Sequence, residues 1–139
     1  MRQHQSILEV ATPGRGFHEI TDLVRAAVRE SGIAVGQATV FCAHTSCSLC
    51  IQENADPSAR RDLERWLKRL APERDPAYTH IAEGPDDMPS HLRALVTRTS
   101  ETIPVAAGEL ALGTWQGIYL AEHRARPHAR RLVVHVIGA

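Results

Sequence analysis

The sequence predicts a single α+β domain, residues 1–139, with a mainly antiparallel sheet that carries its helices on one face. Segments of alternating polar and apolar residues at both ends of the chain are typical of strands. Three segments with apolar residues at helical spacing lie between them. The C-terminal half joins its strand-like segments by short turns, which favours hairpins over long crossovers. A chain of 139 residues also fits one core, since single domains usually hold about 100–150 residues.

The first third of the chain predicts a strand, a helix and a hairpin. Residues 4–10 alternate as a strand does and end in a loop rich in glycine and proline. Apolar residues from Phe17 to Val28 recur at helical spacing, and Ser31-Gly32 supplies a stop. Residues 35–44 indicate a strand, with residues 47–53 as its hairpin partner across Thr45-Ser46. His44 would therefore end a strand beside a turn.

Two more helices are expected in the middle of the chain. Asp56-Pro57 is a strong helix start, because aspartate caps the first turn and proline at the first position loses no hydrogen bond. Its apolar stripe, and that of a short helix at residues 89–96 which Asp87 could cap, are expected to face the core. The stripes comprise Leu63, Trp66, Leu67 and Leu70, then Leu92, Leu95 and Val96. Arginines and a lysine on the other side of the first helix are either a solvated face or a phosphate-binding surface.

Three strand-like segments close the chain, at residues 101–105, 109–124 with a break near Gly113, and 130–137. In a continuous strand, Trp115, Tyr119 and His123 would share a face that the apolar core residues do not use. We expect this aromatic face to be a ligand platform or a subunit interface.

Composition excludes several classes of function. Sixteen basic and sixteen acidic residues, with a pI near 7.1, argue against a nucleic-acid-binding protein, and the apolar runs are too short for a membrane span. The N-terminus has no apolar signal-peptide region, so a cytoplasmic location is expected. Cys42, Cys47 and Cys50 resemble part of an iron–sulfur spacing that lacks a fourth cysteine, and we interpret them as buried packing residues.

Residues 78–91 concentrate two histidines and three carboxylates in fourteen positions. Such groups are costly to bury unless they pair with one another or hold a cation, so the segment is either a solvated loop or a site. The candidate histidines, which flank loops or end strands, are His44, His80, His91 and His123. Together with the carboxylates Glu83, Asp86 and Asp87 they indicate a divalent-metal or acid/base site.

Four motifs in order along the chain resemble the YjbQ-like family, whose members are often labelled secondary thiamine-phosphate synthases. The resemblance covers almost the whole sequence. The motifs are His44-Thr45-Ser46, then Asn54-Ala55-Asp56-Pro57, then His80–His91 with Glu83-Gly84-Pro85-Asp86-Asp87-Met88-Pro89, and Leu112-Gly113-Thr114-Trp115-Gln116-Gly117-Ile118-Tyr119-Leu120 followed by Glu122-His123-Arg124. This sequence departs from the expected pattern at Cys47 and Cys50, where small or hydroxyl residues are more usual.

The resemblance implies a homotrimer and an enzyme that joins a hydroxymethylpyrimidine diphosphate to a thiazole phosphate, a small phosphorylated substrate, with release of pyrophosphate. On this basis His80, His91 and His123 are expected to bind one divalent ion (Mg, Mn or Zn), with His44 and Asp87 as catalytic acid/base groups. The substrate-binding residues would be Thr45, Ser46, Asn54, Trp115, Gln116 and Arg124. The alternative is a non-catalytic trimeric module that binds a small ligand or a metal.

Overall fold

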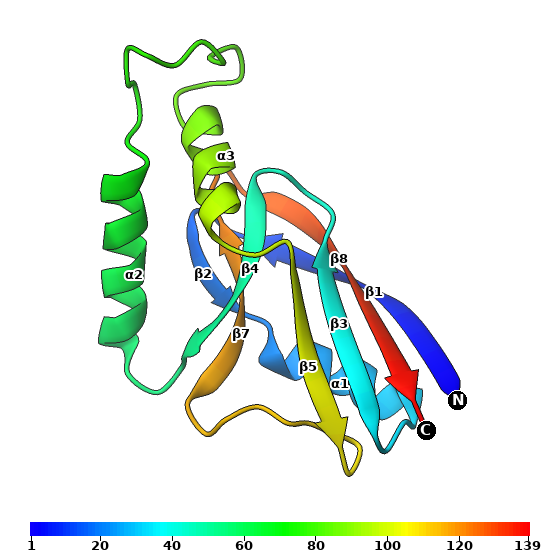
Figure 1. The fold of residues 1–139 in the computed structure, drawn as a ribbon. Coiled ribbons are helices and arrows are strands. Elements are labelled where there is room, and N and C mark those ends of the chain that lie inside the picture. Colours follow the sequence, from blue (N-terminus) through cyan, green and yellow to red (C-terminus); the bar gives the residue numbers. More distant parts are fainter.

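Eight strands form two antiparallel sheets that enclose a core together with three helices (Figure 1). The computed structural model describes all 139 residues. The elements in chain order are β1 (Arg2–Thr12), β2 (Gly16–Glu19), α1 (Thr21–Ser31), β3 (Gly36–Cys42), β4 (Cys47–Glu53), α2 (Pro57–Leu70), α3 (Asp87–Val96), β5 (Ser100–Ala106), β6 (Glu109–Leu110), β7 (Gln116–Glu122) and β8 (His128–Gly138). The predicted α+β class in one domain is confirmed, but the expected single sheet is divided into two.

The large sheet has the strand order β1-β8-β3-β5-β6, and the small sheet has the order β2-β7-β4. The two terminal strands pair along their whole length, from Arg2 opposite Gly138 to Thr12 opposite His128. The alternation of β8 is confirmed, because Leu132, Val134 and Val136 are fully buried. None of the three helices has the length and apolar composition that a membrane span requires.

The hairpin predicted across Thr45-Ser46 is wrong. β3 pairs with β5 and β8 in the large sheet, whereas β4 pairs with β7 in the small sheet. The chain therefore passes from one sheet to the other at this turn, and Cys42 and Cys47 meet in the core with their sulfur atoms 3.4 Å apart. Alternation marks each segment as a strand but does not choose its partner, so two alternating segments beside a short turn suit a hairpin equally well.

The segment from Phe17 to Val28, predicted as one helix, contains a short strand followed by a helix. Residues 16–19 form β2, which pairs with β7, and α1 begins only at Thr21. Phe17 packs edge-on against Tyr119, with ring centroids 6.1 Å apart. The predicted stop is confirmed, since Gly32 caps α1 with a φ of 66°, a left-handed conformation that suits glycine.

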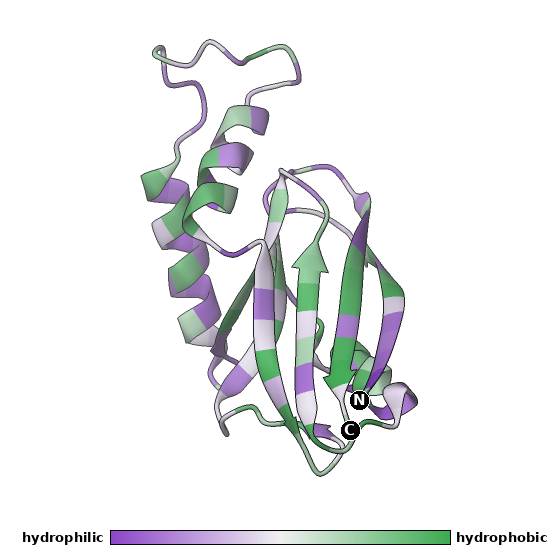
Figure 2. Ribbon diagram, turned by 45° about the vertical axis from the view of Figure 1, so that its right-hand side comes forward, coloured by the Kyte–Doolittle hydropathy of each residue, from purple (hydrophilic) through white to green (hydrophobic).

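The helix starting at Asp56-Pro57 is confirmed, because the Asp56 carboxylate accepts a hydrogen bond from Ser58 N at 2.9 Å. The prediction that its apolar stripe is buried is wrong in large part. Leu67 is the only buried residue of α2, and Trp66 is 50% exposed. Figure 2 shows hydrophobic and hydrophilic residues alternating along both α2 and α3.

α3 is turned about its axis relative to the prediction. Its polar residues Asp87, Ser90 and Arg93 are buried, whereas Leu95 is 78% exposed and Val96 is half exposed. Asp87 is the first residue of the helix and not its cap; Asp86 holds the cap position without a side-chain hydrogen bond. Asp87 forms ion pairs, described below, and Ser90 and Arg93 donate hydrogen bonds to the carbonyls of His123 and Ala71. These polar contacts outweigh the apolar stripe in orienting this helix.

The main core joins α1 to both sheets, and a second cluster joins α2 to the small sheet. The second cluster contains Phe17, Leu67, Tyr119 and Ala121. Tyr119 is thus 4% exposed, which corrects the expectation of an uncovered aromatic face. Trp115 precedes β7 and is 64% exposed.

The three cysteines behave as packing residues. Cys42 and Cys47 are 1% exposed and belong to the main core, and all three cysteines are free thiols. Burial raises the pKa of Cys50 to about 12, so its thiol stays protonated at neutral pH.

Candidate metal centre

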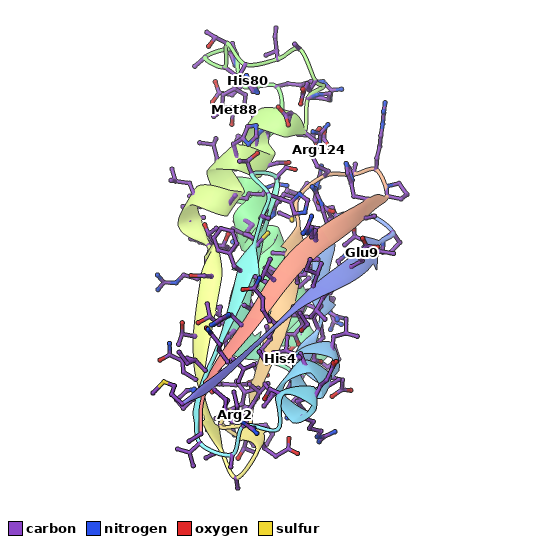
Figure 3. All side chains as sticks on the ribbon, turned by 90° about the vertical axis from the view of Figure 1, so that its right-hand side faces the viewer. Arg2, His4, Glu9, His80, Met88 and Arg124 are labelled. Atoms are coloured by element: carbon purple, nitrogen blue, oxygen red, sulfur yellow. The ribbon has the colours of Figure 1, made fainter.

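His80, Asp87 and His91 meet at the N-terminal end of α3, with one ligand atom from each lying within 4.8 Å of the others. Asp87 Oδ2 is 2.9 Å from His80 Nε2 and 3.3 Å from His91 Nε2. The two imidazole rings have centroids 5.3 Å apart and planes inclined to each other by 54°. In Figure 3 His80 lies beside Met88 at the end of the molecule that is far from Arg2.

Local structure explains how the three side chains converge. Asp87 and His91 are four residues apart on α3, so they project from one face of the helix. His80 comes from the loop between α2 and α3, which runs from residue 71 to residue 86 and crosses above α3 in Figure 1. One carboxylate oxygen is therefore placed between two imidazole nitrogens.

Asp87 is 1% exposed, so its charge requires partners. Its second oxygen, Oδ1, accepts a hydrogen bond from Arg124 Nη1 at 2.8 Å. Arg124 also donates to Asp86 Oδ2 at 3.2 Å and to the Glu83 carbonyl at 3.0 Å. Arg124 was expected to contact a substrate phosphate. Its donors instead bind the loop before α3 to the end of β7 and orient Asp87.

The hydrogen bond of His91 determines which of its nitrogens can bind a metal. Nδ1 lies 3.0 Å from the Thr45 carbonyl oxygen, which can only accept, so Nδ1 carries the proton. In the neutral ring Nε2 then holds a lone pair that faces the lone pairs of Asp87 Oδ2. That arrangement is repulsive unless a proton or a cation lies between the two atoms. Metal-binding histidines characteristically have their other nitrogen fixed in this way.

His123, expected as the third histidine ligand, is not part of this group. It is 2% exposed, and its Nε2 lies 2.8 Å from Ser48 Oγ. Burial and the charges of Arg93, Arg130 and Arg15 lower the pKa of His123 to about 3, so the ring is neutral at pH 7. The structure groups Asp87, expected as an acid/base group, with His80 and His91 instead of His123.

His44, predicted as an acid/base group, and Ser46, predicted to bind substrate, form hydrogen bonds with residues of β8. His44 Nε2 accepts a hydrogen bond from the Arg131 backbone at 2.8 Å, and burial together with the charge of Arg130 lowers the pKa of His44. Ser46 Oγ accepts a hydrogen bond from Arg130 Nη2 at 3.0 Å. Of the His44-Thr45-Ser46 motif, only Thr45 touches the metal group, through its carbonyl.

Three expected substrate-binding residues lie at the opposite end of the small sheet. Gln116 and Asn54 stand at the end where Glu53 pairs with Gln116, whereas His123 follows the end where Cys47 pairs with Glu122. Six residues of strand separate the two ends, a distance of about 20 Å. Asn54 Nδ2 donates to Glu19 at 3.0 Å, and Gln116 Oε1 accepts from Gly113 N at 2.8 Å. Within one chain, Asn54, Trp115 and Gln116 cannot act on a molecule bound at His80.

Two sets of polar residues escaped prediction from the sequence. One is the buried ion pair of Glu122 with Arg130, and the other is Arg93, which is buried in the middle of α3. No local pattern marks either set, because Glu122 and Arg130 lie on strands of different sheets and Arg93 donates to Ala71 in the preceding loop. The Asp87–His91 spacing was a visible signal for two ligands on one helical face.

The chain is similar over nearly its whole length to proteins from several bacteria. It is 52% identical to a UPF0047 protein of Synechocystis, over 99% of this chain and 93% of that protein. It is 38% identical to the UPF0047 protein YjbQ of Escherichia coli, over 97% of this chain and 98% of that one.

Solved structures share the fold. A protein of the YjbQ/UPF0047 family from Clostridium acetobutylicum superposes with a TM-score of 0.83 at 38% identity, covering 96% of this chain and 99% of that one. A conserved hypothetical protein from Thermus thermophilus gives a TM-score of 0.85 at 37% identity, covering 95% and 99%.

These relatives overturn the predicted activity. The curated proteins are named only as UPF0047 proteins, and a similar structure from Sulfolobus solfataricus is described as a protein of unknown function. Nothing in them supports thiamine-phosphate synthesis, nor the alternative of a non-catalytic trimeric module. The family resemblance itself is confirmed, since the family model described as UPF0047 protein YjbQ-like matches residues 6–139. The chain belongs to the UPF0047, YjbQ-like family.

Proposed function

We propose that His80, Asp87 and His91 bind one divalent metal ion and that this centre hydrolyses a small phosphorylated substrate. The observation that carries the proposal is the position of Asp87 Oδ2 between two imidazole nitrogens, one of which has its tautomer set by Thr45. Two imidazoles and one carboxylate suit Zn or Mn better than Mg, which prefers oxygen ligands and water.

The three protein ligands leave further coordination positions open, as in catalytic rather than structural sites. A bound ion of this kind lowers the pKa of a coordinated water and polarises a phosphoryl oxygen. Arg124 holds Asp87 by its other oxygen, so the carboxylate keeps one orientation. Thr45 does the same for His91.

The surroundings of His80 suit a small anionic substrate. A cavity of about 210 Å³ adjoins His80 and is lined by Arg74, Asp75, Tyr78 and Met88, among others. The Arg74 side chain is 77% exposed and makes one long contact of 3.9 Å with Glu73, so its guanidinium is available to a phosphate group.

The proposal is tested by metal analysis of the purified protein after saturation with Zn, Mn or Mg and removal of free ions. About one ion per chain is expected for the wild type, and much less for His80→Ala and His91→Ala. His128→Ala and His135→Ala are matched controls that keep full occupancy. Circular dichroism confirms that each variant is folded. Equal occupancy in all variants, or no metal in the wild type, would contradict the metal centre.

Hydrolysis is tested with p-nitrophenyl phosphate as a generic phosphoester. We expect turnover that a chelator abolishes, that the metal restores and that His91→Ala lacks. Full metal occupancy without turnover of this ester would leave the metal centre standing and overturn the hydrolase assignment.

We also propose that the chain assembles as a homotrimer. Apolar side chains on α2 and α3 are left at the surface, and they include Trp66, Leu70, Leu95 and Val96, each about half exposed or more. Two neighbouring helices with uncovered apolar residues are typical of a surface that a second subunit covers.

A further inference from the structure

A second polar site lies on the other side of α3 from the metal centre. It is a cavity of about 390 Å³ bounded by α2, α3 and the small sheet, and none of the three metal ligands lines it. Five cationic residues contribute to its wall; we call it the basic cavity after Arg15, Arg61, Arg65, Lys68 and Arg93. The volume is within the range of roughly 300–1,000 Å³ that small-molecule pockets occupy.

The carboxylates of the wall do not balance these charges. Glu122 is neutralised by Arg130, which binds both of its oxygens from outside the cavity. Glu64 uses Oε1 to accept a hydrogen bond from Phe17 N at 3.1 Å. Arg15 pairs with Glu73 at 2.9 Å, but Arg61, Arg65 and Lys68 form no ion pair. The cavity therefore keeps an excess of positive charge.

Arg93 is the most informative member of the wall. It is 2% exposed, it donates from Nη2 to the Ala71 carbonyl at 3.0 Å, and its buried Nε has no hydrogen-bond partner. A buried guanidinium without an anion is unusual, because desolvation of the charge costs several kcal/mol. Burial and the charge of Arg15 lower the pKa of Arg93, as expected for a cation that faces another cation and lacks a close counter-ion.

His123 completes the wall as a neutral ring, since its pKa is lowered to about 3. It can donate or accept a hydrogen bond without adding charge. Guanidinium groups offer parallel N–H donors that match the oxygens of a phosphate group, and α2 supplies flexible cationic side chains at the opening.

We propose that the basic cavity binds a phosphate group carried by a small molecule, with Arg93 at its floor and Arg61, Arg65 and Lys68 of α2 around it. This site is separate from the metal centre and does not depend on the function proposed for that centre. The basic face of α2, which the sequence left open between a solvated surface and a phosphate-binding surface, is then a phosphate-binding surface on the side that meets the cavity.

Calorimetric titration of the whole chain, with chelator present to empty the metal centre, tests the proposal. The titrants are inorganic phosphate, pyrophosphate and phenyl phosphate, and they separate a free anion from a phosphate group on an organic body. Saturable binding of any of them supports the site. The titrant that binds most tightly shows whether the site prefers a free anion or a phosphate group on an organic body. No saturable binding up to about 10 mM for all three would overturn it.

The helix offers a matched pair of double variants. Arg61→Ala/Lys68→Ala removes two cations that line the basic cavity, whereas Arg60→Ala/Arg69→Ala removes two from α2 that do not. Both variants change the net charge equally. We expect the first to weaken binding by about tenfold or more and the second to change it by less than about twofold. Equal weakening in both would show non-specific attraction and overturn the proposal.

Nuclear magnetic resonance locates the bound anion. Pyrophosphate is expected to shift the ring signals of His123, and Arg93→Lys, which keeps the charge but loses the fork of donors, should reduce this shift. Shifts at His80 and His91 instead of His123 would place the anion at the metal centre and overturn the basic cavity as its site.

Discussion

Glu122 of the small sheet and Arg130 of the large sheet form a buried ion pair with two hydrogen bonds. Arg130 Nε donates to Glu122 Oε1 at 2.7 Å, and Nη2 donates to Oε2 at 2.6 Å. Burial opposes ionisation of Glu122, but the hydrogen bonds from Arg130 and Thr12 hold the pKa of this carboxyl below its usual value. The pair links the two sheets where β7 ends and β8 begins.

Glu122→Gln is expected to lower the free energy of unfolding by about 3–5 kcal/mol, because it leaves the Arg130 charge buried without an anion. Glu109→Gln, which breaks the exposed pair with Arg29, is the control and should leave stability nearly unchanged. Urea unfolding followed by circular dichroism measures both. A smaller loss for Glu122→Gln than for Glu109→Gln would contradict the structural role of the pair.

Because the pKa of His123 is lowered, we expect the free energy of unfolding to decrease as the pH is lowered. The unfolded chain takes up this proton near pH 6.5, whereas the folded protein does so only near pH 3. Between these values the unfolded state binds one more proton, so acid favours unfolding by up to about 1.4 kcal/mol per pH unit. Urea unfolding of the chelator-treated protein at pH 7, 6 and 5 measures the slope.

His123→Asn should flatten this slope between about pH 5 and pH 6.5. His44 also has a lowered pKa and adds a slope of the same sign, but it is present in both proteins and cancels in the comparison. Glu122 contributes only below its usual pKa of 4.5, outside the range compared. The same slope in the variant and the wild type would show that His123 is protonated in the folded protein.

The three cysteines are expected to be dispensable for the metal centre. Changing Cys42, Cys47 and Cys50 to Ala should keep metal content and fold, at a cost of about 1–3 kcal/mol in stability from lost packing. Metal analysis and thermal unfolding of the triple variant check this. Loss of metal from a folded triple variant would assign the thiols a role beyond packing.

The trimer predicts a mass of about 46 kDa in analytical ultracentrifugation, three times the 15.3 kDa of the chain. Leu95→Glu on α3 should dissociate it, because a carboxylate would be buried in the interface. Leu23→Glu on α1, where the wild-type side chain is 46% exposed, is the control at a distance from α2 and α3. A wild type that stays at the mass of one chain at micromolar concentration contradicts the assembly.

The parts of the fold that sequence predicted correctly depend on neighbours within a few residues. Asp56 caps α2 through Ser58, Gly32 ends α1, and the alternation of β8 reports the buried face of that strand. Family membership also followed from short motifs. For the site, the dense polar segment at residues 78–91 marked His80, Asp87 and His91 as candidates, but the sequence grouped His123 and not Asp87 with the two histidines.

The tertiary structure decided what depends on distant partners. β3 and β4 are joined by a short turn yet belong to different sheets, since β3 pairs with β5 and β8 and β4 pairs with β7. α3 turns its polar face inward because Arg124, 37 residues from Asp87, neutralises that carboxylate. His91 forms a hydrogen bond with Thr45, which is 46 residues away in the sequence, and His123 forms one with Ser48, which is 75 residues away. Such pairs are chosen by burial and charge balance over the whole chain, so only the folded molecule shows which histidines share a site.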